Sequence, residues 1–413
     1  MNSRVSSALW VYRSLIWGWV RNKLGLVQNK KPPMGQPVDA VVSDVRAVLL
    51  FGYMGLGDAI MFEPTLRWLI EKYPAATIDL VVGSASQSFP ILARIMEMNN
   101  RQFRRVYNAD PKSMSGRELS RLNAELSEVG YDLCVASYTT PTPYFVRAVQ
   151  SGRWRVGHAY SPQPWYKPRP NYLFNFPVHV HQKVDEHEIL RQFRLVEALG
   201  AQSSSIAPTP LFSAPQHARE WASNFIRDAR LEGKRLICVH IGASKAMEWK
   251  TWPNERFGAV FSHLASPDTH FLFFGAGSEA EQIEAARKMV QLQSTNLAGT
   301  IDVIQVTALI ERCQMMIGND SGIGHLALVQ GIRTLRLFGP SDYHGYRSYA
   351  EGHSDKFKGL TCSPCWRLGS LVPGYNVTNC GHRNCFMKIS VEEVTRTAVE
   401  LLNAVPRSQD QAS

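Results

Sequence analysis

The sequence predicts an α/β protein with two parallel, doubly wound sheets in separate domains that face each other across a cleft. Three observations support this prediction. Apolar segments typical of buried strands alternate with amphipathic segments typical of helices along most of the chain. The alternation restarts after residues 202–216, which are rich in Ser and Pro and indicate a domain junction. Glycine turns follow several predicted strands, and sheets of this type bind ligands at such places.

The first half of the chain contains four segments with the apolar character of strands and two with the pattern of helices. The predicted strands are residues 45–52, 76–83, 131–138 and 153–160. The predicted helices are residues 58–74, with Asp58 placed to cap the helix start, and residues 185–200, which end on Gly200.

The second half repeats the same rhythm. Residues 234–244 are a predicted strand that opens into a glycine turn, and residues 251–266 are a predicted helix. Residues 269–291 and 313–331 are each predicted to form a strand, a glycine-containing turn and a helix, and a last strand is expected within residues 334–342. We therefore expect an N-terminal domain over residues 41–212 and a C-terminal domain over residues 213–405.

A basic segment, residues 1–40, precedes the first domain. It holds six basic residues and no acid before Asp39, so it supplies +6 of the net charge of +10 and leaves only +4 for the remainder. No nucleic-acid-binding signature accompanies that modest charge, which argues against a nucleic-acid partner, although the pI near 9.3 and the cysteine cluster described below favour one.

Residues 8–20 of this segment are apolar, include Trp10, Trp17 and Trp19, and are interrupted by Arg13. They are too short to span a bilayer, which takes roughly 20 residues, and no small-residue cleavage site of a secretory signal follows. A helix with this composition either lies in the interface of a membrane with anionic lipid or packs on the protein itself.

The turn Gly52-Tyr-Met-Gly55-Leu-Gly57 leads to Asp58. It lacks the Lys-Ser/Thr pair of a phosphate-binding P-loop, and its glycine spacing reverses that of a dinucleotide fingerprint. The acid expected at the end of the second strand is also missing, because Asp79 lies inside that strand. Asp58 has two interpretations: it is the general base toward a sugar hydroxyl, or it only caps the helix.

The segment Ile317-Gly-Asn-Asp-Ser-Gly-Ile-Gly-His325 carries the most specific pattern. Ser321 and Gly322 open a predicted helix, and backbone N–H groups at a helix start bind phosphate well. Asp320 in the turn could orient a ribose, a sugar or a cation. His325 could donate to a phosphate or simply complete the packing.

A third group follows the strand at residues 234–244. Gly242 to Ser244 form a turn, and Lys250 precedes Trp252-Pro253 at a helix start. A lysine at the end of a strand can neutralise a leaving diphosphate, whereas most single lysines are solvated surface charges.

These motifs together resemble the bacterial heptosyltransferases of glycosyltransferase family 9. The resemblance covers about residues 45–400 and rests on "GYMGLGDAIMFEPTLRWLIEKYPAATIDLVV", "KTWPNERF", "GAGSEAEQ" and "GNDSGIGHLALVQGIRTLRLFGPSD", in the family's order and spacing. It implies the GT-B fold, two Rossmann-like domains across a cleft. It also implies transfer of a heptose from an ADP-sugar to the lipopolysaccharide core with inversion. We expect this reaction at the cytoplasmic face of a bacterial inner membrane, with the basic N-terminal segment as the part that contacts its lipid.

The resemblance also implies roles for single residues. Asp58 matches the general base, with Gly55 and Gly57 making room on the acceptor side. Lys250, Asp320, Ser321, Gly322 and His325 match the positions that hold the donor diphosphate, and Ser244 belongs to the same side. Glu279 stands where an acid often meets the ribose, although Glu281 competes with it. No D-x-D metal motif is present, so we expect no cofactor for catalysis.

Four of the seven cysteines crowd together near the C-terminus. Cys362 and Cys365 form a C-x-x-C pair, 14 residues separate Cys365 from Cys380, and four separate Cys380 from Cys385. This spacing suits a structural zinc ion or another structural metal in a reducing compartment, with His382 able to replace one thiolate, or disulfides in an oxidising one. The best-known heptosyltransferases lack these cysteines, so the donor sugar stays open. An inactive nucleotide-sugar-binding protein is the alternative to an enzyme.

Overall fold

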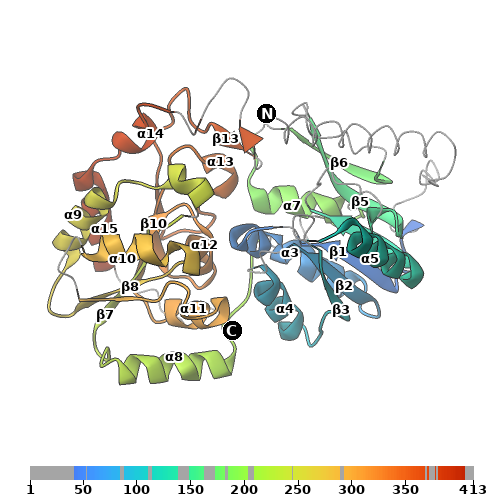
Figure 1. Cartoon of the computed structure of the whole chain (residues 1–413), viewed down its shortest axis with the longest axis horizontal. Helices are drawn as coiled ribbons and strands as arrows, with labels where there is room; N and C mark the ends of the chain where they lie inside the picture. Colours follow the sequence, from blue (N-terminus) through green and yellow to red (C-terminus); the bar gives the residue numbers. More distant parts are fainter. Residues whose placement is uncertain are drawn as a thin grey trace. The chain divides into compact units, whose positions relative to one another are not determined.

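A computed structural model of the chain shows two compact units, Met1–Leu211 and Phe212–Ser413 (Figure 1). The structure describes residues 41–52, 54–83, 88–109, 114–137, 148–161, 173–181, 185–202, 209–243, 245–288, 293–367, 370–371, 377 and 380–404. The basic segment of residues 1–40, with its expected interfacial helix, lies outside the described residues. Among the described residues, no helix is long and apolar enough to cross a membrane.

The first unit contains a six-stranded parallel sheet with the order β3-β2-β1-β4-β5-β6. Its strands are β1 (Ala47–Phe51), β2 (Thr77–Val82), β3 (Arg105–Asn108), β4 (Tyr131–Ala136), β5 (Gly152–Ser161) and β6 (Phe176–His181). Its helices are α3 (Leu56–Lys72), α4 (Ser88–Met98), α5 (Gly116–Val129) and α7 (Glu188–Glu197). Helix α3 packs against both α4 and α7, while Leu122 and Leu126 of α5 join the core on the other face of the sheet.

The second unit repeats this plan, with the strand order β12-β11-β10-β7-β8-β9, again parallel throughout. Its strands are β7 (Arg235–His240), β8 (Thr269–Phe273), β9 (Ser294–Asn296), β10 (Met315–Asn319), β11 (Arg333–Leu337) and β12 (Ser354–Lys356), and a separate antiparallel pair is formed by β13 (Trp366–Arg367) and β14 (Ser370–Leu371). Its helices are α8 (Gln216–Asp228), η2 (Lys245–Lys250), α9 (Asn254–Leu264), η3 (Gly277–Glu279), α10 (Ala280–Lys288), α11 (Val303–Ile310), α12 (Gly322–Val329), α13 (Tyr343–Tyr346), α14 (Asn384–Met387) and α15 (Val391–Asn403).

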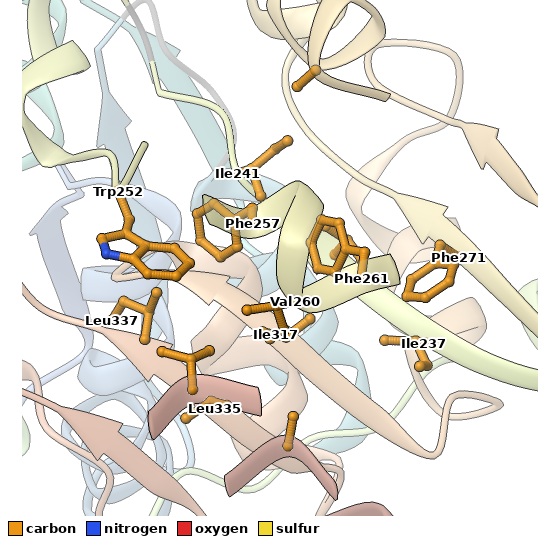
Figure 2. Packing of buried hydrophobic residues seen from close by; sticks show 14 of the residues in the cluster. Ile237, Ile241, Trp252, Phe257, Val260, Phe261, Phe271, Ile317, Leu335 and Leu337 are labelled. Atoms are coloured by element: carbon orange, nitrogen blue, oxygen red, sulfur yellow. The ribbon is translucent and has the colours of Figure 1, made fainter. Parts of the chain in front are cut away.

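The core of the second unit lies between its sheet and helices α9, α10 and α15. Every second residue of the strands faces this core, as in Ile237 and Val239 of β7, because successive side chains of a strand point to opposite faces. Figure 2 shows Trp252 and Phe257 beside the strand residues of this cluster. Trp252 is fully buried, and its ring meets that of Phe257 edge to face at 4.9 Å. This aromatic packing fixes the start of α9 on the sheet.

The two parallel six-stranded sheets confirm the predicted fold class. The pattern did not reveal the edge strands β3 and β6. Only one of the four residues of β3 is buried, so its sequence lacks an apolar run. Pro177 in β6 is a poor strand residue, but it is tolerated at a sheet edge because no neighbouring strand needs its missing N–H there.

Each sheet changes its direction of growth at one pair of neighbouring strands. In the first unit the chain adds β2 and β3 on one side of β1, and then β4 to β6 on the other. In the second unit the same change occurs between β7 and β10. The loops after the two strands of such a pair diverge to opposite faces, which leaves a crevice at the carboxyl ends of the strands. The turn before Asp58 and the Asp320 motif both follow strands of this kind.

Helix α3 carries one fully buried carboxyl group, that of Glu63. One of its oxygens lies 3.1 Å from Nε of Arg67, and the other accepts the backbone N–H of Leu211 at 2.9 Å. Arg67 also donates to the carbonyl of Thr209 at 3.1 Å. Burial raises the pKa of Glu63 to about 7 from an ordinary 4.5, with a smaller push from Glu71, although Arg67 and the Leu211 N–H oppose the change.

This raised pKa makes the stability of the protein depend on pH. Between pH 4.5 and about 7 the unfolded chain loses the Glu63 proton while the folded chain keeps it, so the unfolding free energy falls as the pH rises. The loss amounts to about 3 kcal/mol on the scale of 1.36 kcal/mol per pKa unit. We expect Glu63→Gln to remove this part of the pH dependence, measured as urea-unfolding free energies at pH 5 and pH 8.

Glu97→Gln is the matched control, because Glu97 forms an exposed ion pair with Arg94 in the same unit. Its pH dependence should follow that of the unaltered protein. If Glu63→Gln does the same, the buried carboxyl does not contribute to the pH dependence.

Candidate functional site

The functional site of the second unit is built around the neighbouring ends of β7 and β10. In this pair Gly318 lies opposite His240. A Cβ atom on Gly318 would stand 2.1 Å from the carbonyl oxygen of His240, so only glycine allows the two strands to approach this closely. The loops that follow both strands therefore leave the sheet from almost the same point.

The side chain of Asn319, the last residue of β10, joins these loops. Its Oδ1 accepts the backbone N–H of Trp252 at 2.9 Å, and its Nδ2 donates to the carbonyl of Ile241 at 3.0 Å. The side chain is buried, so both hydrogen bonds are shielded from water. Breaking either one would leave a buried polar group without a partner, which costs free energy. Asn319 thereby holds the loop after β7, and with it Lys250, beside the end of β10.

Lys250 ends the short helix η2 and faces Asp320. Its Nζ lies 3.0 Å from Oδ2 of Asp320, with the lysine side chain 26% exposed and the aspartate side chain 6% exposed. Ser321 is the N-cap of α12, and its Oγ accepts the N–H of Gly324 at 3.3 Å. A cation and the start of a helix thus lie next to each other, which is an arrangement suited to a phosphate group.

His325, in the first turns of α12, is buried and lies against the fully buried Arg336 of β11. Nη1 of Arg336 is 3.2 Å from Nε2 of His325. A guanidinium only donates, so Nε2 must accept and the ring proton of a neutral His325 belongs on Nδ1. Asp355 of β12 lies 3.2 Å from Nε of Arg336 and balances its charge. In the structure, His325 therefore has the packing role, which is the second of its two predicted roles.

Glu279 and His240 form a second buried pair at the ends of β8 and β7. Nε2 of His240 lies 3.5 Å from Oε2 of Glu279, and the same oxygen accepts the N–H of Ala276 at 2.8 Å. Burial acts to raise the pKa of Glu279, but the His240 contact and the Ala276 N–H outweigh it, and the net change is a lowered pKa. Glu279 is held in place by these groups, whereas Glu281 is exposed.

Asp58 of the first unit is a capping residue, but not in the predicted position. Helix α3 begins two residues earlier than expected, at Leu56 with Gly55 as N-cap, so Asp58 is the third residue of the helix. Its Oδ2 accepts the N–H of Gly55 at 3.2 Å. Gly57 lies within the first turn. The sequence placed the helix start at Asp58 because Asp is the stronger cap signal, whereas glycine also serves as an N-cap.

Asp79 has the structural role that its place inside β2 indicates. It is fully buried and pairs with Arg104, whose Nε lies 2.9 Å from Oδ1. The hydroxyl of Tyr131 donates to its other oxygen at 2.6 Å. Arg104 directly precedes β3 and Tyr131 begins β4, so Asp79 is occupied by structural partners and does not serve as the ribose acid of a dinucleotide site.

The four clustered cysteines are all free thiols in the structure. Cys365 and Cys385 are buried, and Cys362 and Cys380 are partly exposed. Burial, followed by the neighbouring thiolates of the other three, raises the pKa of Cys365 to about 11. Among the described residues, no group of three or more His, Cys, Asp or Glu side chains is arranged to hold a metal ion.

The structure brings Lys250 and Asp320 together and places Ser321, Gly322 and His325 on the adjoining helix. Ser244 lies outside the described residues. Two buried residues of this region were not anticipated: His240 and Arg336. Arg336 had a readable signal, because a charged residue in the middle of an apolar strand needs a buried partner.

Comparisons with known proteins were made on this basis. A family model described as Glycosyltransferase family 9 (heptosyltransferase) matches residues 120–375. Lipopolysaccharide heptosyltransferase 2 of Salmonella typhimurium is 23% identical over 309 residues, which cover 71% of this chain and 83% of the relative.

Two solved structures share the fold. The E. coli ADP-heptose lps heptosyltransferase II is 17% identical with a TM-score of 0.65, covering 86% of this chain and 98% of that one. The dodecameric iron-containing heptosyltransferase TibC, a protein of enterotoxigenic E. coli solved in complex with ADP-D-beta-D-heptose, is 15% identical with a TM-score of 0.52 and covers 87% of this chain and 76% of that one.

Proposed function

The chain belongs to glycosyltransferase family 9 and is a glycosyltransferase, and we propose that it transfers a heptose from ADP-heptose to the lipopolysaccharide core. We place this reaction at the cytoplasmic face of a bacterial inner membrane. The observation that carries the proposal is the Lys250–Asp320 pair beside the start of α12, at the point where the second sheet changes direction. The names of the relatives, which include ADP-heptose and lipopolysaccharide, support this choice of donor and acceptor.

The second unit supplies the groups that a leaving diphosphate requires. Negative charge grows on the bridging oxygen as the sugar–phosphate bond breaks, and a fixed cation with oriented N–H groups stabilises it. Lys250 and the N–H groups at the start of α12 have this character. Asp320 keeps the lysine side chain oriented, and Ser321 and His325 lie on the helix that meets the phosphates. Glu279, held beside His240, is proposed to contact the ribose.

The first unit supplies the base. In an inverting transfer the acceptor hydroxyl attacks the anomeric carbon from the face opposite the departing ADP and gives its proton to a carboxylate. We assign this carboxylate to Asp58, with Gly55 and Gly57 leaving space for the acceptor sugar. The proposed reaction therefore needs both units.

The donor class is tested with a panel of nucleotides. ADP should raise the thermal midpoint more than UDP, GDP or CDP, because a ligand that binds only the folded state stabilises it in proportion to ln(1 + [L]/Kd). AMP is the control for the diphosphate contacts and should give a smaller shift than ADP. A clear preference for UDP would exclude an ADP-sugar donor.

The Asp58→Asn variant separates the base from the cap. Asn keeps an oxygen that can accept the Gly55 N–H, so α3 should be retained, but it cannot take a proton. Transfer from ADP-heptose should fall by about 10²–10⁴, the usual contribution of a general base, with the ADP-induced thermal shift unchanged.

Asp44→Asn, an exposed position in the same unit, should retain full transfer. A fully active Asp58→Asn protein would show that Asp58 only caps the helix. A wild-type chain that binds ADP without any turnover would support the inactive sugar-nucleotide-binding alternative.

We further propose that Cys362, Cys365, Cys380 and Cys385 hold a structural metal and that catalysis uses no cofactor. Support comes from the spacing of the four cysteines along the chain. Zinc suits a four-thiolate set, and the related TibC is described as containing iron. In such a site the metal would only stiffen the segment.

The metal proposal predicts that the purified chain contains about one zinc or iron per molecule by elemental analysis, and that a strong chelator lowers its thermal midpoint because metal binding contributes to folding. Cys362→Ser should lose the metal, while Cys313→Ala, a change in the buried core, should keep it. A metal-free chain from metal-replete cells, with a thermal midpoint that the chelator leaves unchanged, would refute the site.

A further inference from the structure

Arg383 lies in the cysteine-rich segment, and its guanidinium reaches the loop that carries Lys250. Its Nη2 donates to the carbonyl oxygen of Thr251 and lies 3.5 Å from the carbonyl oxygen of Trp249. Trp249 and Thr251 are the two chain neighbours of Lys250. The side chain of Arg383 therefore contacts the backbone on both sides of Lys250, the lysine that we assign to the donor diphosphate.

The backbone of Arg383 is unusual as well. Its φ is 45° and its ψ 33°, in the left-handed region that residues other than glycine seldom adopt. Such a conformation persists only where surrounding contacts hold it, and it is often found at functional positions. The hydrogen bond from Arg383 to the carbonyl of Thr251 is a contact of this kind. It joins two residues that are 132 positions apart in the sequence.

The segment around Arg383 is itself anchored to the core of the second unit. Phe386 is buried, and its backbone carbonyl accepts the indole N–H of Trp252 at 3.2 Å. A Cβ atom on Gly339 would stand 2.2 Å from the Phe386 ring, so the ring lies directly on this part of the backbone. The backbone near Arg383 is therefore held against the core of the second unit.

A second contact joins the same two segments. The rings of Trp249 and Trp366 lie 5.2 Å apart, and Trp366 directly follows Cys365. The backbone N–H groups of Cys365 and Trp366 both donate to the carbonyl of Pro340 at 3.0 Å. The cysteine-rich segment thus meets the Lys250 loop at Trp249 and at Thr251.

Lys250 needs such support. Its ion pair with Asp320 orients the ammonium group, but the lysine side chain is 26% exposed and the pair does not fix the backbone that carries it. The backbone of η2 is a six-residue 3₁₀ helix, whose hydrogen-bond geometry is poorer than that of an α-helix. Arg has several donors in a rigid fork, which suits it to hold two carbonyl groups at once.

We propose that Arg383 is a positioning residue for Lys250, and that through it the cysteine-rich segment sets the affinity of the site for the diphosphate of the donor. The proposal rests on the proposed function, since it takes Lys250 to contact that diphosphate. It adds a structural reason for a cysteine-rich segment in this glycosyltransferase: the segment shapes the donor site without touching the reacting atoms.

A double-mutant cycle on ADP binding tests the proposal, with calorimetric Kd values for Lys250→Met, Arg383→Met and the double variant. We expect Lys250→Met to raise the Kd by about tenfold or more, as for the loss of one charge-assisted hydrogen bond. Arg383→Met should raise it by about fivefold, and the double variant should match Lys250→Met within about twofold, because Arg383 acts only through the lysine. Arg383→Lys keeps a single donor group, so its Kd for ADP should lie between those of the unaltered protein and Arg383→Met. If Arg383→Met does not fold, Arg383→Lys replaces it in the double-mutant cycle.

Arg256→Met is the matched control. Arg256 holds the other end of the same segment, since its Nη1 donates to the carbonyls of Met387 and Ile389 at 2.9 and 2.8 Å, but no hydrogen bond or ion pair recorded for the described residues joins it to a neighbour of Lys250. Its removal should lower the unfolding free energy while the Kd for ADP stays within about twofold, because it leaves the grip of Arg383 intact.

The outcomes separate this inference from the proposed function. If Lys250→Met leaves the Kd for ADP unchanged, the assignment of Lys250 to the diphosphate is wrong, and the inference fails with it. If Lys250→Met weakens binding but the effect of Arg383→Met is absent, or adds fully in the double variant, the proposed function stands and the positioning role is wrong. An additive effect would mean that Arg383 meets the nucleotide itself.

Discussion

The proposed donor site depends on the side chain of Asn319. Two hydrogen bonds from one buried amide join the end of β10 to the loop after β7 and to the backbone of Trp252. The missing side chain of Gly318 makes this possible, because it lets the two strands come close enough for a short amide to reach both partners. Lys250 lies two residues before Trp252, so the two hydrogen bonds of Asn319 also hold Lys250 near Asp320. The chemistry of the site is therefore set by a residue that need not touch the donor.

A second property of this region is that three of its acidic side chains are each paired with a basic one. Lys250 faces Asp320, His240 faces Glu279, and Arg336 faces Asp355. Pairing removes the large cost of an isolated buried charge, and it also fixes the direction of each side chain. A diphosphate that enters such a site meets oriented groups and must share Lys250 with Asp320. The carboxylate keeps the lysine in place and also moderates the attraction, so in the proposed reaction the product nucleotide can leave.

The sequence predicted the features that local patterns encode. Apolar runs located the central strands of both sheets, and helical periodicity located five of the helices, including those that follow β1, β8 and β10. The glycine turns pointed to the ends of these strands. The Asp320-Ser-Gly motif was visible because all of its parts are consecutive. The contacts of Arg383 with Trp249 and Thr251 and of His240 with Glu279 were not, because each joins residues far apart in sequence, and a pattern carries no information on which distant loop a side chain meets. The start of α3 was missed by two residues for a related reason, since glycine and aspartate compete as N-caps.

In the proposed reaction, Asp58 combines a capping contact with the role of the base. The N-terminus of a helix favours a negative charge, so the position suits a carboxylate that has to be ionised before the acceptor arrives. The hydrogen bond from the Gly55 N–H limits the rotation of the Asp58 side chain. It therefore lowers the entropic cost of orienting the carboxylate for the reaction. When the bond from the sugar to the departing nucleotide is largely broken before the proton moves, the acceptor hydroxyl becomes acidic as it bonds to the electron-poor carbon, and a well-oriented carboxylate is then a sufficient base.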